Sequence, residues 1–244
     1  MAHYKRVITA GPLVIEAIYP AQNPRDTASV RQGKRNMSSE AQRRMNLKYC
    51  YQKLEMLLAA NFVSGDLFVT LTYEPAQLPG SRAEAGKHVA AFVRKLRAFR
   101  SGAELKEVHV TEHKTSGGRF HHHIVLNNVG EDYEAIMHLW QHGLAHIHPL
   151  VFDREHTYEE LAKYMCKESR DKLGHRLWSC TRNLSKPERD STRVPNDTSL
   201  VPPEGATVLA DTGDVLTTYG HYRFIKYLLP GIVPQKPRRK RRRR

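Results

Sequence analysis

Cysteine is scarce in this chain, and long apolar runs are missing from it. The three cysteines, Cys50, Cys166 and Cys180, form no CxxC pair, which argues against a disulfide framework or a cysteine zinc site and favours a reducing compartment. No apolar run approaches the ~18–20 residues of a membrane span, and residues 1–10 lack the apolar stretch of a secretory signal. No GxxxxGK[ST] motif is present, which excludes a built-in P-loop helicase. We therefore expect a cytoplasmic protein without a membrane partner.

Acidic residues are also few relative to basic ones. The 244 residues include 39 Lys and Arg against 25 Asp and Glu, a net charge of +14. Eight positive charges lie in the run KPRRKRRRR at residues 236–244, and the remainder carries only +6. Such a balance suits a polyanionic partner, most commonly nucleic acid.

The basic tail at residues 236–244 has nothing apolar to bury, and its like charges repel, so we expect it to be disordered. We expect it to bind phosphates without sequence specificity, because each neutralised phosphate releases counterions. Arg238, Arg239, Lys240 and Arg241 are its candidate DNA contacts. A solvated end that only aids solubility and a nuclear-import signal are the alternative interpretations.

Hydrophobic periodicity predicts the main elements. The predicted strands cover residues 67–73, 107–112, 119–126 and 145–150, and the helices lie near residues 38–62, 89–99, 133–140 and 157–169. Residues 114–118 (KTSGG) are short enough to join the second and third strands as a hairpin. From residue 67 the order is β-α-β-β-α-β plus one more helix. This order predicts an α+β, ferredoxin-like or RRM-like split βαβ fold, with helices on one side of an antiparallel sheet and an added C-terminal helix.

The predicted domain organisation has four parts. Residues 1–37 form an N-terminal strand and loop segment, and residues 38–187 form the main domain with its leading helix. Residues 188–235 combine a linker with C-terminal strands packed on the core, and residues 236–244 are the tail. Prolines at 187, 195, 202 and 203 predict a long loop over residues 184–203. Residues 206–218 suggest a hairpin, and residues 222–229 suit a strand or a short helix.

Three consecutive histidines in the predicted strand 119–126 point to metal chemistry. Because side chains alternate along a strand, His121 and His123 share one face and His122 points to the other. Glu112 lies nine residues before His121, on the strand that pairs with the histidine strand in the hairpin. Two imidazoles and a carboxylate suit Mn²⁺ or Mg²⁺ and also accept Zn²⁺. We therefore predict a divalent-metal site here, against the alternative of hydrogen-bonded surface histidines.

Two other histidine pairs compete with this prediction. His146 and His148 match a His-apolar-His pattern, but they follow a helix, run into Pro149 and have no acid on a hairpin partner. His138 and His142 lie four residues apart on a predicted helix, which a solvated helix face explains equally well.

Tyr164 and Lys167 are the candidate reactive pair on the last predicted helix. They lie one turn apart and so on one side of it. Tyr164 lies beside the apolar stripe of Leu161 and Met165, which places its hydroxyl at the edge of the sheet. A tyrosine at such a position is most often a packing residue. The predicted metal site, the nearby lysine and the basic charge make it a candidate nucleophile.

The runs FVTLTY, VTEHKTSGGRFHHHIVLN and LAKYMCKE resemble the three ordered motifs of HUH endonucleases. The likeness spans about residues 38–187 and is greatest to the single-tyrosine rolling-circle replication initiators of phages, plasmids and prophage-like elements. It implies His121, His123 and Glu112 as metal ligands, Tyr164 as nucleophile and Lys167 as its companion. The chain departs from the family at His122, where a bulky apolar residue is usual.

The resemblance implies metal-dependent, sequence-specific nicking and joining of single-stranded DNA through a 5′-phosphotyrosine intermediate. Such chemistry initiates rolling-circle replication of a phage, plasmid or integrated element in the bacterial cytoplasm. The expected partners are a single strand or origin hairpin, a host polymerase and a helicase. Further DNA contacts are expected from Thr70, Thr72, Arg119 and Lys163.

Two alternative functions stay open. An HUH transposase or mobilisation relaxase has the same active site but different partners. A non-catalytic, RRM-like nucleic-acid-binding regulator with structural histidines belongs to another class and forms no covalent adduct.

Overall fold

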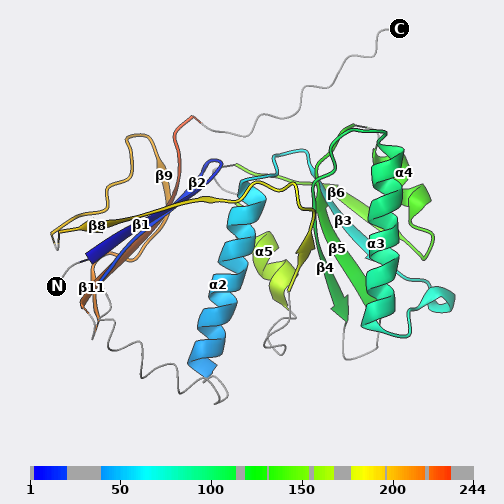
Figure 1. Ribbon diagram of the computed structural model, residues 1–244, viewed down its shortest axis with the longest axis horizontal. Coiled ribbons are helices and arrows are strands. Elements are labelled where there is room, and N and C mark those ends of the chain that lie inside the picture. Colours follow the sequence, from blue (N-terminus) through cyan, green and yellow to red (C-terminus); the bar gives the residue numbers. More distant parts are fainter. Residues whose placement is uncertain are drawn as a thin grey trace, which may run out of the picture. The chain divides into compact units, whose positions relative to one another are not determined.

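The computed structural model describes residues 3–20, 40–113, 119–130, 132–153, 157–167, 177–195, 197–217 and 220–231. Contacts divide the chain into two compact units, which Figure 1 shows as ribbons. Unit 1 contains residues Met1–Ala60 and Ser185–Val233, and unit 2 contains Asn61–Leu184. Each unit has its own antiparallel sheet, so the chain is α+β.

Unit 2 has the predicted βαββαβ order. Its elements are β3 (Leu67–Thr72), the 3₁₀ helix η2 (Pro75–Gln77), α3 (Arg82–Phe99), β4 (Glu107–His113), β5 (Phe120–Leu126), α4 (Asp132–Leu139), β6 (Ala145–Pro149), α5 (Glu159–Cys166) and β7 (Ser179–Cys180). The sheet order is β6-β3-β5-β4-β7, and all of its neighbours are antiparallel. This arrangement confirms the ferredoxin-like prediction, with α5 as the added helix.

Alternation along the strands of unit 2 separates a core face from a second face. Leu67, Val69 and Leu71 of β3 join a buried cluster with residues of α3 and α4, including Phe92 and Ile136. The intervening residues of β3 therefore lie on the opposite face of the sheet.

A buried ion pair holds the end of α3 to the loop that follows β5. The Arg100 guanidinium donates two hydrogen bonds to the Asp132 carboxylate, at 3.0 and 2.9 Å, and both side chains are fully buried. Arg100 also donates to the carbonyl oxygen of Glu104 and to the side chain of Asn127. Because Asn127 directly follows β5, this network fixes the end of the strand that bears the histidines.

Unit 1 is built from both ends of the described chain. Its elements are β1 (His3–Ala10), β2 (Leu13–Pro20), α2 (Glu40–Ala59), β8 (Glu188–Val194), β9 (Thr207–Asp211), β10 (Val215–Thr217) and β11 (Gly220–Leu228). The strand order is β10-β11-β2-β1-β8, and β9 also pairs with β11. The strands of residues 206–229 thus form one sheet with the N-terminal hairpin.

The loop predicted over residues 184–203 was wrong for β8. This strand, ERDSTRV, has one apolar residue, and most of its side chains are exposed, so it lacks the hydrophobic pattern of a half-buried strand. Backbone pairing with β1, from His3 opposite Val194 to Thr9 opposite Glu188, supplies its order instead.

Helix α2 groups with unit 1, although the sequence placed it in the domain of residues 38–187. Lys226 on β11 forms a buried ion pair with Glu55, with 3.1 Å between Nζ and Oε1. At the β1–β2 turn, Gly11 has φ +55°, and a Cβ there would approach the Ala59 carbonyl oxygen to 2.6 Å. Helix periodicity predicted an apolar face but could not identify the sheet that covers it.

Several predictions fall on residues outside the described ranges. These are the hairpin link 114–118 and the basic tail with Arg238, Arg239, Lys240 and Arg241. Within the described ranges, no helix combines the length and apolar character needed to cross a membrane.

Candidate active site

The register of β5 places two of the three histidines on the face opposite α3 and α4. His121 pairs with Glu112 on β4, and His123 pairs with Thr70 on β3. Directly opposed residues of neighbouring strands project from the same face. His121, His123, Glu112 and Thr70 therefore share one face, as strand alternation predicted.

His123 and Glu112 form the centre of the candidate site. His123 Nε2 lies 2.8 Å from Glu112 Oε2, and only 3% of His123 and 4% of Glu112 are exposed. Burial lowers the pKa of His123, although the hydrogen bond with Glu112 opposes this shift. For Glu112, burial acts to raise the pKa, but the bonds with His123 and Lys167 outweigh it and lower the pKa. The pair is thus a neutral imidazole beside a carboxylate at neutral pH.

Thr70 and Phe68 orient the His123 ring. Thr70 Oγ1 lies 3.2 Å from Nδ1 of His123, so the hydroxyl donates to Nδ1 when Nε2–H donates to Glu112. The Phe68 ring stacks on the imidazole at 5.8 Å between centroids and 13° between planes. Sequence analysis proposed Thr70 as a DNA contact and missed Phe68, whose position i−2 to Thr70 was the available clue.

Helix α5 brings Tyr164 and Lys167 to this pair. The Tyr164 hydroxyl lies 3.4 Å from His123 Nε2, and 42% of the tyrosine is exposed. Lys167 Nζ lies 3.1 Å from Glu112 Oε1 and 3.9 Å from the centre of the Tyr164 ring. Burial acts to lower the pKa of Lys167, but its bond with Glu112 outweighs burial and raises the pKa. An accessible phenol, an ammonium group, an imidazole and a carboxylate therefore meet in one cluster.

His122 does not reach this cluster, because it faces the core of unit 2. It is fully buried, and its two ring nitrogens hydrogen-bond with Tyr73 at 2.8 Å and Thr111 at 3.0 Å. Burial lowers the pKa of His122 to about 3, so this ring stays neutral. The polar residue in the usual apolar position is thus accommodated by two hydroxyl partners.

The competing histidine pairs lie elsewhere in unit 2. His146 and His148 are exposed on β6 and pair with Thr70 and Phe68 of β3. They share the face of His123 but are separated from β5 by β3. The second predicted pair is not on one helix, because α4 ends at Leu139 and His142 follows it.

The remaining predicted DNA contacts have different surroundings. The Thr72 hydroxyl donates to the Leu144 carbonyl oxygen at 3.2 Å, and Arg119 is exposed just before β5. The Lys163 ammonium pairs with Glu159 at 2.8 Å and Glu160 at 2.7 Å on its own helix, so neighbouring carboxylates offset its charge.

The donor set fits a divalent cation in its chemistry. Neutral imidazole nitrogen and carboxylate oxygen suit Mn²⁺, Mg²⁺ and Zn²⁺, and the Lys167 ammonium already makes Glu112 the partner of a cation. Within the described ranges, no three His, Cys, Asp or Glu side chains form a ready metal cluster. An ion that binds here therefore has to compete with Lys167 for the Glu112 carboxylate.

The segment that contains all these residues resembles a replication protein. Residues 66–169 match the family model of the replication-associated protein ORF2. The match covers β3 to α5 and leaves unit 1 outside it. No curated protein and no solved structure matches the chain. The family match is consistent with a replication initiator that acts on DNA.

Proposed function

We propose that the protein is a metal-dependent, HUH-type endonuclease of the single-tyrosine class. It cuts and rejoins one DNA strand to initiate rolling-circle replication of a phage, plasmid or integrated element. The observation behind this proposal is the meeting of Tyr164 with His123, Glu112 and Lys167, within the segment that matches a replication-associated family.

The proposed nucleophile is the Tyr164 hydroxyl. Its oxygen forms a bond to the scissile phosphorus, the bond from phosphorus to the 3′ oxygen breaks, and this oxygen takes up a proton. The products are a 5′-phosphotyrosyl enzyme and a free 3′-hydroxyl that can prime a polymerase. Because one phosphodiester replaces another, the reverse reaction can rejoin the strand.

Lys167 and Thr70 have supporting roles in this proposal. The Lys167 ammonium, close to the Tyr164 ring, stabilises negative charge on the phenolic oxygen as its proton leaves. The Thr70 hydroxyl can donate to or accept from His123 Nδ1, so it supports the tautomer in which Nε2 is available as a ligand. His121, His123 and Glu112 are the proposed ligands of Mn²⁺ or Mg²⁺, and the bound ion would draw charge from the phosphate oxygens.

The decisive experiment detects the covalent adduct. The full chain is incubated with a labelled single-stranded oligonucleotide carrying its replicon's origin and Mn²⁺, then run on a denaturing gel. We expect an adduct with the wild type and none with Tyr164→Phe, while single-strand binding is nearly unchanged. Tyr158→Phe, at a buried tyrosine just before the start of α5, is the control and keeps the adduct.

The same gel separates the proposal from its alternatives. An adduct that persists in Tyr164→Phe rejects the nucleophile. Binding without any adduct supports the non-catalytic regulator. An adduct whose released strand is transferred to a different DNA molecule favours a transposase or relaxase.

A further inference from the structure

One face of the unit 1 sheet combines tyrosines and arginines, and it lies outside the segment of the family match. Tyr4 on β1 pairs with Tyr19 on β2 and with Arg193 on β8. Arg6, two residues after Tyr4, and Arg189, opposite Ile8, project from the same face because side chains alternate along a strand. Three strands therefore contribute to one surface.

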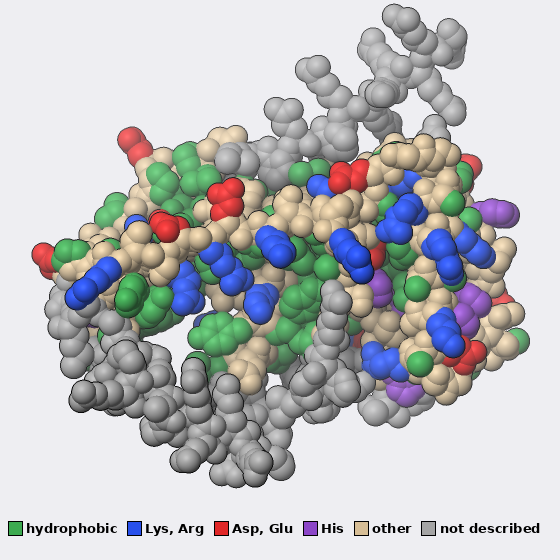
Figure 2. Space-filling view, in the orientation of Figure 1, with side chains coloured by type: hydrophobic (Ala, Val, Ile, Leu, Met, Phe, Trp, Pro, Cys, Tyr) green, Lys and Arg blue, Asp and Glu red, His purple; other side chains and the backbone are tan. Residues whose placement is uncertain are grey.

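Strand β8 sorts its charges between the two faces. Arg189 and Arg193 lie on the face of Tyr4, whereas Glu188 pairs with Thr9 and Asp190 with Val7 on the other face. The arginines are exposed. Alternation thus gives the tyrosine face of β8 only positive charge, and Figure 2 shows Lys and Arg side chains along the region of β1 and β8.

The aromatic part of this surface is preorganised. The Tyr4 and Tyr19 rings stack at 6.1 Å between centroids and 28° between planes. The Arg6 guanidinium lies 4.9 Å from the centre of the Tyr19 ring and donates a 3.0 Å hydrogen bond to its hydroxyl. Tyr4 is 38% exposed. A stacked ring pair with a guanidinium above it offers both an aromatic plane and a positive charge.

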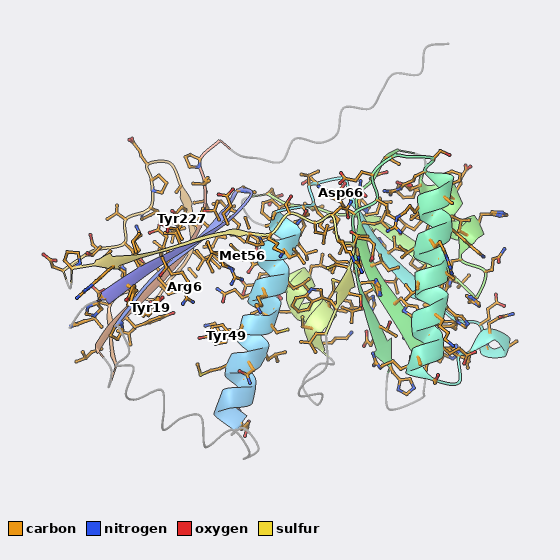
Figure 3. All side chains as sticks on the ribbon, in the orientation of Figure 1. Arg6, Tyr19, Tyr49, Met56, Asp66 and Tyr227 are labelled. Carbon is orange, nitrogen blue, oxygen red and sulfur yellow. The ribbon has the colours of Figure 1, made fainter. Side chains whose placement is uncertain are left out.

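Tyr222 on β11 and Tyr49 on α2 extend the same surface. Tyr222 precedes Phe224, which pairs with Ala17 on the tyrosine face of the sheet. Burial raises the pKa of Tyr222, Tyr49 adds to this shift and Arg6 opposes it, so these groups are neighbours. In Figure 3, Arg6 and Tyr19 lie on the side of the sheet toward α2, and Tyr49 extends from α2 toward the sheet.

We propose that this tyrosine–arginine surface is a second binding site, whose ligand is single-stranded DNA. The surface consists of Tyr4, Arg6, Tyr19, Arg189, Arg193 and Tyr222. The arginines bind successive phosphates and the tyrosines stack on unpaired bases, a combination typical of single-strand binding without sequence readout. A duplex hides its base faces, which is why we assign an unpaired strand. The site needs no nicking and goes beyond the proposed endonuclease.

The charge of the surface is tested with a matched pair of double variants. Binding of the full chain to fluorescent (dT)20 is measured by anisotropy in EDTA over a series of salt concentrations. Arg189→Ala/Arg193→Ala should weaken binding at least about tenfold and lower the salt slope by about 1.4, because each lost phosphate contact contributes about 0.7. Arg94→Ala/Arg97→Ala, at exposed positions of α3, removes the same charge and should change affinity by less than about twofold. Equal losses in both double variants would overturn the proposal.

The aromatic part is tested by photocrosslinking the wild-type chain to a (dT)20 that contains 5-iodouracil. We expect crosslinked peptides containing Tyr4 or Tyr19, and crosslinks confined to residues 61–184 would contradict the site. A 20-base-pair duplex is the specificity control. If Arg189→Ala/Arg193→Ala weakens duplex binding as much as single-strand binding, the assignment to an unpaired strand is wrong.

The proposal and the endonuclease can fail separately. Adduct formation with a short origin oligonucleotide should be unchanged in Arg189→Ala/Arg193→Ala, because these residues lie outside unit 2. Loss of all adduct formation in the wild type, with crosslinks to Tyr4 or Tyr19 intact, would reject the endonuclease and keep the second site.

Discussion

Replacing Lys167 by methionine tests the charge that the structure places between the two halves of the site. Its ammonium is 3.1 Å from Glu112 Oε1 and 3.9 Å from the centre of the Tyr164 ring. Two unit charges about 4 Å apart interact by about 1 kcal/mol in water and about 4 kcal/mol at an effective dielectric constant of 20. The Lys167 side chain is 37% exposed, so solvent screening keeps the interaction between these limits. A loss of about 1–4 kcal/mol in the transition state lowers the nicking rate about 5- to 900-fold.

Single-turnover kinetics isolate this effect from DNA binding. The variant is mixed with a saturating amount of labelled origin oligonucleotide and Mn²⁺, and covalent adduct is quantified after rapid quenching. Lys163→Met is the matched control, because Lys163 lies on the same helix but pairs with Glu159 and Glu160. We expect the control to remain within about twofold of the wild type.

Two results would refute this reasoning. A Lys167→Met rate within twofold of the wild type would mean that its ammonium does not stabilise the reacting phenol. Equal losses in Lys167→Met and Lys163→Met would show that only the overall positive charge of α5 matters.

Two further perturbations test the metal centre and its support. His123→Ala should reduce Mn²⁺-dependent nicking about 100-fold or more, whereas His146→Ala should retain it, as measured by adding MnCl₂ to EDTA-dialysed protein; the reverse order would move the metal site to β6. Arg100→Met should lower the free energy of unfolding by about 3–5 kcal/mol in urea titrations, because it leaves the buried Asp132 carboxylate without its ion pair. Adding Asp132→Leu should recover part of this loss, and strictly additive losses would show that the two side chains are not coupled.

Local periodicity was sufficient for unit 2 because its strands and helices bury what their own sequences mark as apolar. The alternation in LFVTLT matches the observed buried and half-buried positions of β3. Strand β8 had no such pattern, and its partner β1 lies at the other end of a long stretch of chain. A pairing of this kind depends on backbone hydrogen bonds and on the closing of a long loop, neither of which local sequence reports.

At the candidate site, the sequence predicted the shared face of His121, His123 and Glu112, since strand alternation and the hairpin register decide it. It did not predict the contact of Lys167 with Glu112, which depends on how α5 lies over the sheet. The stacking of Phe68 on His123 was also missed, because β3 is the spatial neighbour of β5 but not its neighbour along the chain.

Unit 1 is discontinuous, and this has a consequence during synthesis. All the strands of the histidine-bearing sheet lie within residues 61–184, whereas β1 and β2 must wait for β8 and β11. Until those strands leave the ribosome, both edges of the β1–β2 hairpin keep unpaired backbone groups, which are templates for association with another chain. A polypeptide that stops before β8 is therefore expected to retain the histidine-bearing sheet but to aggregate through its N-terminal hairpin.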